Sequence, residues 1–105
     1  MITAIVRFKV PAETTLEQAT NAYQGTAPKY QGLPGLVRKY YLFAEGGEVG
    51  GVYLWESREQ AEAFYNADWK KFIVDRYGDE PKIQYFESPV IVDNAISEVI
   101  VDAAE

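Results

Sequence analysis

The sequence contains no cysteine and no histidine among its 105 residues. Without cysteine the chain has no disulfide, no thiolate nucleophile and no Cys-ligated zinc or iron–sulfur centre. Without histidine it lacks the usual ligand of haem and zinc and the commonest general base. Catalysis would have to use carboxylates, tyrosine, lysine, arginine, amides or the substrate itself. Because a phosphate-binding glycine loop is also missing, we expect no metal, haem or flavin cofactor.

Positive charge and long apolar runs are scarce as well. Ten Lys and Arg residues stand against 16 Asp and Glu, which gives a net charge of -6. The negative electrostatic potential of such a chain repels phosphate backbones and anionic lipid headgroups. We therefore expect neither nucleic acid nor a membrane surface as a partner. No apolar run reaches the roughly 18 residues that cross a bilayer, and the first residues lack the basic region of a signal peptide. We therefore expect a cytoplasmic protein.

Aromatic residues are abundant, with eight Tyr, five Phe and two Trp in a chain that is 48% apolar. A chain of this length is too short for two independent cores. We predict one domain over residues 1–105, of which residues 94–105 form a C-terminal tail.

Apolar periodicity predicts the order strand, helix, strand, strand, helix, strand. Alternation over residues 2–10 predicts the first strand, and similar runs predict strands over 36–45, 49–56 and 81–88. A capping box from Thr14 to Glu17 predicts the start of the first helix, and another at Ser57 starts the second. The second helical stripe ends at Gly78, with a break near Asp68 as a second cap. This order predicts an α+β, ferredoxin-like βαββαβ domain with an antiparallel sheet and both helices on one face.

The sheet is predicted to be apolar on both faces. Strands 36–45 and 49–56 carry large apolar side chains at odd and even positions alike, as in a sheet that is covered on both sides. The helices cover only one face. We therefore expect a homodimer in which a second copy covers the other face, with the tail reaching the partner.

Gly46 and Gly47 predict a two-residue type I′ hairpin turn. That turn would place Arg38, Tyr40, Tyr53 and Trp55 on one face, as a cradle for a flat anionic aromatic molecule. The alternative is that these are ordinary strand aromatics and that Arg38 extends into solvent.

Other candidates lie on the second helix and near the last strand. Tyr65 and Trp69 are candidate binding residues, although their helical spacing is more typical of a core. Trp69 follows the predicted helix break, where a pocket could open. Asp93 is a candidate base if it is buried. Gly50 and Gly51 indicate close backbone packing or a bulge.

The segments Gly50-Gly51-Val52-Tyr53-Leu54-Trp55-Glu56-Ser57, Gln60-Ala61-Glu62-Ala63-Phe64-Tyr65 and Arg76-Tyr77-Gly78 follow one another in an order that resembles the YdhR-like monooxygenases. That group lies in the dimeric α/β-barrel superfamily of the antibiotic-biosynthesis monooxygenases. The resemblance runs from Leu33 to Asn94. It implies a ferredoxin-like protomer, a homodimer and a pocket between sheet and helices. Haem-degrading relatives use a histidine ligand that this chain lacks.

The leading functional hypothesis is a cofactor-independent monooxygenase acting on a small phenolic or enolic aromatic compound. Such an enzyme deprotonates its substrate and lets the resulting anion reduce oxygen. Tyr40, Tyr53 or Asp93 would move the proton and Arg38 would hold the anion. The alternatives are a non-catalytic homodimer that binds a small ligand, and an isomerase of the same superfamily.

Overall fold

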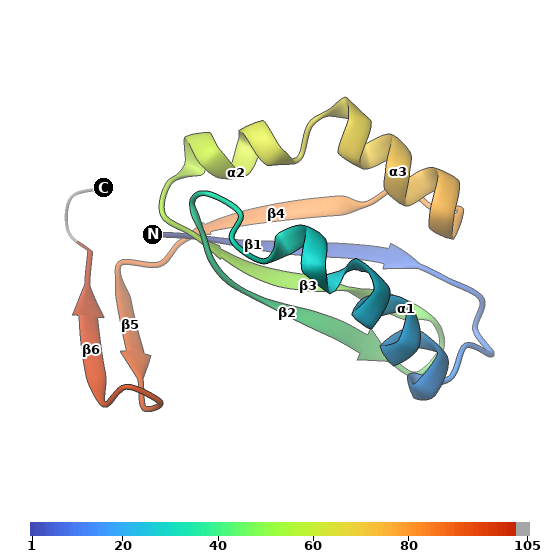
Figure 1. Cartoon of the computed structure of the whole chain (residues 1–105), viewed down its shortest axis with the longest axis horizontal. Coiled ribbons are helices and arrows are strands. Elements are labelled where there is room, and N and C mark those ends of the chain that lie inside the picture. The colour runs from blue at the N-terminus through green and yellow to red at the C-terminus, as the bar shows by residue number, and fades with distance from the viewer. Residues whose placement is uncertain (103–105) are drawn as a thin grey trace.

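The computed structural model describes residues 1–102 and shows a four-stranded antiparallel sheet in the order β2-β3-β1-β4. All three helices lie over one face of this sheet, and a separate two-stranded hairpin follows it (Figure 1). The elements are β1 (Ile2–Lys9), α1 (Leu16–Tyr30), β2 (Leu36–Ala44), β3 (Glu48–Trp55), α2 (Arg58–Phe64), α3 (Ala67–Tyr77), β4 (Lys82–Glu87), β5 (Val90–Asp93) and β6 (Glu98–Val101). The predicted ferredoxin-like architecture is confirmed. No helix in these 102 residues is long and apolar enough to cross a membrane.

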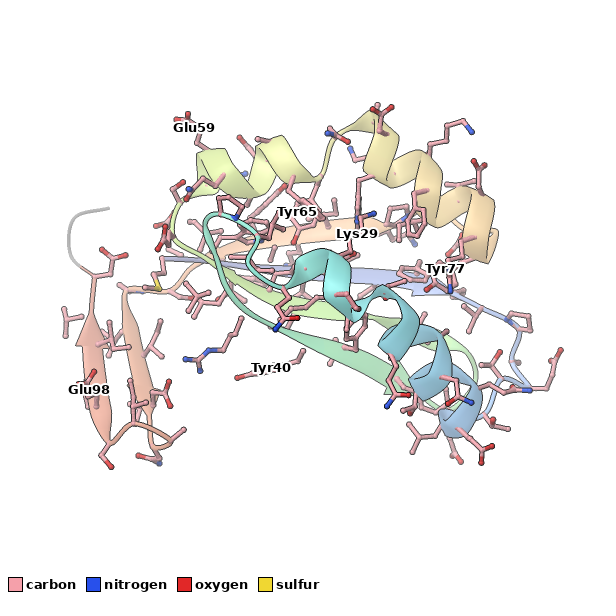
Figure 2. All side chains as sticks on the ribbon, in the orientation of Figure 1. Lys29, Tyr40, Glu59, Tyr65, Tyr77 and Glu98 are labelled. Atoms are coloured by element: carbon pink, nitrogen blue, oxygen red, sulfur yellow. The ribbon has the colours of Figure 1, made fainter. Side chains whose placement is uncertain are left out.

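The core lies between the sheet and the helices. The alternating side chains of β1, Ile2, Ala4, Val6 and Phe8, are all buried there. β1 is central and pairs with β3 and β4, so its even positions carry the middle of the core. Aromatic side chains fill much of the remaining space under the helices (Figure 2).

The caps of α1 and α3 lie one and two residues from the predicted positions. Thr15, rather than Thr14, caps α1, because its Oγ1 accepts from the Gln18 backbone N–H at 3.1 Å and its own N–H donates to Gln18 Oε1 at 2.9 Å. Asn66, rather than Asp68, caps α3 and accepts from the Trp69 N–H at 2.9 Å.

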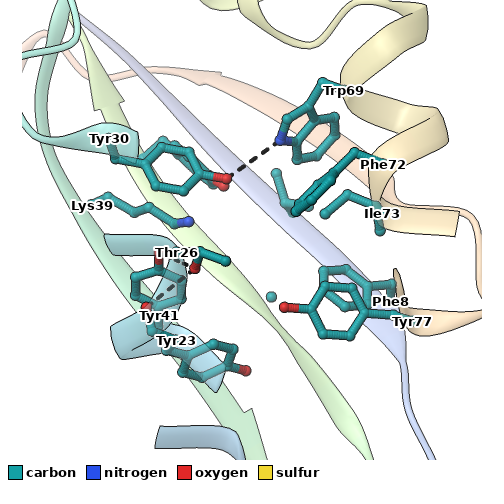
Figure 3. A pocket seen from close by; sticks show the side chains of 13 residues that line it. Phe8, Tyr23, Thr26, Tyr30, Lys39, Tyr41, Trp69, Phe72, Ile73 and Tyr77 are labelled. Atoms are coloured by element: carbon teal, nitrogen blue, oxygen red, sulfur yellow. Dashed lines mark hydrogen bonds between the residues drawn. The ribbon is translucent and has the colours of Figure 1, made fainter. Parts of the chain in front are cut away.

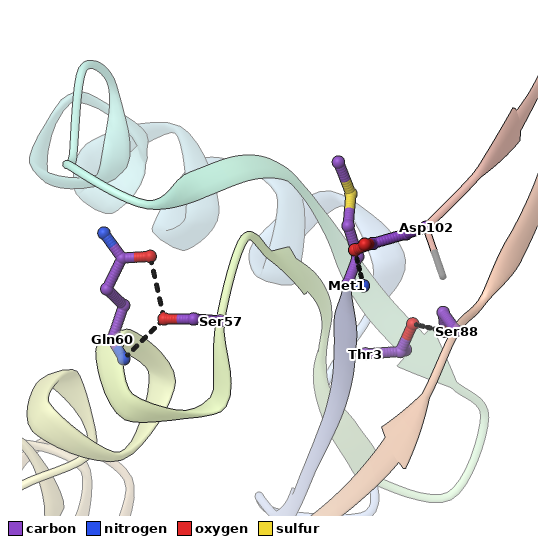
Figure 4. Close-up of polar contacts among 6 residues, drawn as sticks. All are labelled: Met1, Thr3, Ser57, Gln60, Ser88 and Asp102. Atoms are coloured by element: carbon purple, nitrogen blue, oxygen red, sulfur yellow. Dashed lines mark hydrogen bonds and ion pairs between the residues drawn. The ribbon is translucent and has the colours of Figure 1, made fainter. Parts of the chain in front are cut away.

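The remaining helix signals are confirmed. Ser57 caps α2 and accepts from the Gln60 N–H at 3.2 Å (Figure 4). The second helical stripe is split into two helices, α2 and α3, as the predicted break requires, and α3 ends at Gly78.

The β2–β3 turn has three residues, and the predicted two-residue turn is therefore wrong. Ala44 pairs with Glu48, so Glu45, Gly46 and Gly47 form the loop, and both glycines have positive φ. The Gly47 carbonyl accepts from Val10 N–H at 2.8 Å, which ties the loop to the end of β1. A Cβ at Gly47 would lie 2.3 Å from the Val10 carbonyl oxygen, so only glycine fits.

This turn changes the partners across the two strands. Tyr53 pairs with Lys39, and Tyr40 pairs with Val52, so Tyr40 and Tyr53 lie on opposite faces of the sheet. Tyr53 is 2% exposed under the helices, whereas Tyr40 is 55% exposed on the other face. The predicted shared face of Arg38, Tyr40, Tyr53 and Trp55 is therefore wrong, because one extra loop residue exchanges the faces of one strand relative to the other.

The predicted tail is not detached, because its residues 98–101 form β6 and pair with β5 in a hairpin that lies beside one end of the main sheet (Figure 1). The amino group of Met1 forms an ion pair with Asp102, and Thr3 Oγ1 lies 2.6 Å from Ser88 Oγ (Figure 4). These contacts join the hairpin to the N-terminal end of β1. The last part of the predicted tail, residues 103–105, lies outside the described residues.

Candidate functional site

A small cavity lies between the sheet and the helices (Figure 3). It leaves about 20 Å³ of space, which is room for about one water molecule. Residues from α1, α3, β1, β2 and β3 form its wall. The lining residues are Val6, Phe8, Tyr23, Thr26, Tyr30, Lys39, Tyr41, Gly50, Tyr53, Trp69, Phe72, Ile73 and Tyr77.

Lys39 is the charged side chain of this cavity, and it faces aromatic rings. Its Nζ lies 3.4 Å from the ring centroid of Tyr30, 3.7 Å from that of Tyr41 and 4.7 Å from that of Tyr53. Gly51 leaves space for it, since a Cβ there would lie 3.1 Å from Lys39 Cε. The side chain therefore extends from β2 under α1 and toward the middle of the sheet (Figure 3).

The surroundings of Lys39 favour the neutral amine. Burial removes water from the ammonium form and, with the positive charge of Lys29, lowers the pKa of Lys39 to about 7. None of the described residues that line the cavity is acidic, and no carboxylate in residues 1–102 forms an ion pair with Lys39. Lys39 can therefore accept a proton near neutral pH, and the resulting cation faces three electron-rich rings.

Three tyrosines of the cavity wall, Tyr23, Tyr41 and Tyr53, have a raised pKa. Burial raises the pKa of Tyr53 far above its ordinary value, and burial also raises the pKa of Tyr41. Burial raises the pKa of Tyr23 to about 12, and its hydroxyl donates to the Leu42 carbonyl at 2.6 Å. These phenols can donate hydrogen bonds to a ligand, but they cannot serve as bases at neutral pH.

Four of the predicted binding residues come together under the helices. Tyr53 and Trp55 have ring centroids 6.3 Å apart and nearly parallel planes, and those of Tyr65 and Trp69 are 4.9 Å apart. Trp55 Nε1 donates to the Tyr65 hydroxyl at 3.1 Å. Tyr53 and Trp69 line the cavity, whereas Trp55 and Tyr65 pack behind it. Whether any of the four binds a substrate stays a prediction.

Arg38, Tyr40 and Asp93 do not line the cavity, although Arg38 lines a separate pocket at the edge of β2. Arg38 Nη2 donates to Asp93 Oδ2 at 2.6 Å, which links β2 to the hairpin on the face away from the helices. The hydrogen bond from Arg38 lowers the pKa of Asp93, although its side chain is only 6% exposed. A carboxylate with a lowered pKa is a weaker base than an ordinary one. The predicted cradle is thus not formed, and neither Arg38 nor Tyr40 lines the cavity.

Two larger pockets share walls with the cavity. One, of about 320 Å³, lies at the edge of β2 and shares Tyr30, Lys39 and Tyr41 with it. The other, of about 340 Å³, lies between the start of α1 and the end of α3 and shares Tyr23 and Tyr77 with it. The shared residues separate each pocket from the cavity.

The sequence-based reasoning missed Lys39. The sequence does contain a signal for it. Lys39, Tyr41 and Phe43 are alternate residues of one strand, so a single lysine lies on a strand face that is otherwise apolar. With the correct register, this pattern places a lysine in the core beside Tyr53. Within residues 1–102, no group of three or more acidic side chains could hold a metal ion.

No protein-family model matches the sequence, and no curated protein matches it either. Among solved structures, the fold is similar to that of SnoaB, a cofactor-independent oxygenase from Streptomyces nogalater. The two share 15% sequence identity with a TM-score of 0.58, over 83% of this chain and 91% of the SnoaB chain. At this identity the similarity shows a common fold.

Proposed function

We propose that this chain is a cofactor-independent oxygenase that acts on a small phenolic or enolic aromatic compound at the Lys39 cavity. The observation that carries the proposal is the placement of a lysine amine, without a carboxylate partner in residues 1–102, among the rings of Tyr30, Tyr41 and Tyr53. The structural similarity to SnoaB supports the choice of reaction, and the YdhR-like resemblance of the sequence agrees with it.

The reaction begins with a proton transfer. Neutral Lys39 takes the acidic proton of the phenol or enol and becomes an ammonium beside the new anion. The anion passes electrons to dioxygen, and a carbon–oxygen bond forms at the ring or enol carbon. Loss of water from the peroxide leaves a carbonyl. The CH2 group of the keto form plus dioxygen thus becomes a carbonyl plus water. In a phenol, one ring C–H and the O–H are both lost, so that a quinone and water result, and in each case the substrate supplies every electron.

The shape of the site limits how the substrate binds. The inner cavity holds about one water molecule, so a ring enters from the pocket at the edge of β2. There it can lie against Tyr30 and Tyr41 with its hydroxyl toward Lys39 Nζ. The protonated hydroxyls of Tyr41 and Tyr53 are donors for the developing oxyanion.

The test is oxygen uptake by the purified protein with a panel of two-ring and three-ring phenols and enols, together with product analysis by mass spectrometry. We expect uptake with at least one compound and a loss of about 100-fold or more in Lys39→Met. Lys70→Met, a change on the exposed face of α3, serves as the control and should keep full activity. Binding without oxygen uptake by any compound would make the chain a ligand-binding protein and overturn the proposal.

We also propose that the active form is a homodimer. The sheet face away from the helices exposes Tyr40, Leu42 and Phe86 beside polar side chains such as Arg7 and Gln84. The hairpin adds exposed apolar side chains: Val90, Val92, Val99 and Val101 share one of its faces, and Ile96 lies in its turn. A second copy of the chain would cover both surfaces at once, and a stable interface of this kind buries on the order of 2,000 Å².

A further inference from the structure

The pocket at the edge of β2 exposes one side of the Lys39 site to solvent. β2 is the outer strand of the sheet, and the pocket lies between it and the C-terminal end of α1. Its lining includes Tyr30, Lys39 and Tyr41, which also line the inner cavity. Lys39 therefore lines both a pocket of about 320 Å³ and the aromatic cavity, in which its Nζ lies over the ring of Tyr30.

The groups that face Lys39 leave its lone pair available. Lys29 and Tyr30 approach from α1, Tyr41 from its own strand, and Tyr53 from β3. Tyr77 of α3 is a further titratable group in the same cavity. None of the described residues in either lining is an Asp or Glu that would hold the amine as an ammonium ion.

These features describe a nucleophilic lysine. A desolvated lysine with a second cation nearby is a recurring arrangement for attack on carbonyl carbon, because the neutral amine is the reactive form. The ring faces of Tyr30 and Tyr41 supply a stacking surface for a flat group bonded to that carbon.

We propose that the Lys39 amine forms an imine with small aromatic aldehydes that enter through the pocket at the edge of β2. This activity uses no oxygen, and it goes beyond the proposed oxygenase reaction.

The chemistry balances without another reactant. The Nζ lone pair attacks the carbonyl carbon, a proton moves from nitrogen to oxygen, and a carbinolamine results. Protonation of its hydroxyl lets water leave while the nitrogen lone pair forms the C=N bond. The Tyr41 hydroxyl, which keeps its proton and lies 2.8 Å from Thr26 Oγ1, can supply that proton and take one back from nitrogen. Amine and aldehyde thus give imine and water.

The experiment uses the full chain, benzaldehyde as the probe and sodium cyanoborohydride, which reduces the imine to a stable secondary amine. Labelling runs under nitrogen over a series of pH values, and peptide mapping by mass spectrometry compares Lys39 with Lys70 in the same molecules. We expect Lys39 to be labelled at least tenfold faster than Lys70 at neutral pH. The preference should fall as alkaline conditions deprotonate the exposed lysines as well.

Lys39→Arg keeps a cation but has no nucleophilic amine of this kind, and it should lose the fast labelling. Equal labelling of Lys39 and Lys70 in the unaltered protein would overturn the proposal without reference to any variant. The oxygenase proposal is scored separately by oxygen uptake. Labelling of Lys39 without oxygen uptake would leave the imine site standing and remove the oxygenase, and the reverse result would do the opposite.

Discussion

At the scale of single residues, the Lys39 amine contacts aromatic rings, and no carboxylate in residues 1–102 forms an ion pair with it. Ring faces attract a cation, but they replace only part of the hydration that an ammonium loses on burial. The outcome is a pKa of about 7, against about 10.4 for an unperturbed lysine. This incomplete replacement of hydration leaves the amine partly neutral, and so able to act as a base, near pH 7, and it makes the protonated form costly to bury.

The cost of burying this ammonium predicts how stability depends on pH. Because the pKa of Lys39 is lowered on folding, the unfolded chain binds one more proton than the folded chain between about pH 7 and about pH 10. The free energy of unfolding should therefore rise with pH in this window, by up to about 1.4 kcal/mol per pH unit. Below pH 7 both states carry the proton, so Lys39 should add no further pH dependence.

Urea denaturation of the unaltered chain and of Lys39→Met, from about pH 6 to about pH 9, measures this contribution as the difference between the two curves. Lys70→Met is the control and should follow the unaltered chain. A difference between Lys39→Met and the unaltered chain that does not change with pH would show that Lys39 titrates as an ordinary exposed lysine.

Lys29 gives a second test of the same electrostatics. The pKa of Lys39 is lowered first by its own burial and second by the positive charge of Lys29. The Nζ of Lys29 lies 4.1 Å from the ring centroid of Phe72. In Lys29→Gln the pKa of Lys39 should rise, so the pH midpoint of oxygen uptake, or of benzaldehyde labelling, should move to higher pH. Lys71→Gln removes a lysine that is paired with Asp75 on the exposed side of α3, and it should leave the midpoint unchanged. A shift to lower pH in Lys29→Gln would contradict the assignment.

At the scale of elements, the caps determine where the short helices begin. Asn66 accepts from the Trp69 N–H and so starts α3 at the point from which Trp69 enters the cavity wall. Asn66→Ala should lower the free energy of unfolding by about 1 kcal/mol, because the Trp69 N–H loses its capping acceptor. Asp68→Ala should cost only a few tenths, since Asp68 lies within the first turn and contributes through the helix dipole. Thermal unfolding of the two variants separates them, and an equal or larger loss in Asp68→Ala would indicate that Asp68 is the cap.

Because each element from β1 to β4 buries an apolar stripe of its own period, sequence patterns predicted the order and most of the bounds of these elements, but not the β5–β6 hairpin. They did not predict the register of β2 against β3. The loop gains a third residue because the Gly47 carbonyl accepts from Val10, a partner that is far away in the sequence. The candidate site depended on that register. Tyr53 and Trp69, two of the predicted binding residues, line the cavity, whereas Lys39 was not among the predicted site residues.

At the scale of the whole molecule, the chain has one covered sheet face and one open one. The helices cover the face that carries Lys39 and Tyr53, and the open face carries Tyr40 and Leu42. The Arg38–Asp93 ion pair holds the hairpin beside this open face, so the exposed valines of the hairpin lie near the edge of that face. That arrangement suits an isologous contact, in which the same surface of two copies meets across a two-fold axis.

The hairpin allows a direct test of the homodimer. Val92 pairs with Val99, and the two side chains are 66% and 63% exposed. An isolated two-stranded hairpin is marginally stable, so cover from a partner would hold it as well as join the copies. Sedimentation equilibrium at micromolar concentration should show a dimer for the unaltered chain and a shift toward monomer for Val99→Asp. Leu16→Asp is the matched control, because Leu16 is also 63% exposed but lies at the start of α1, far from the hairpin (Figure 1). If Val99→Asp stays as dimeric as Leu16→Asp, the hairpin lies outside the interface, and a monomeric unaltered chain would remove the dimer altogether.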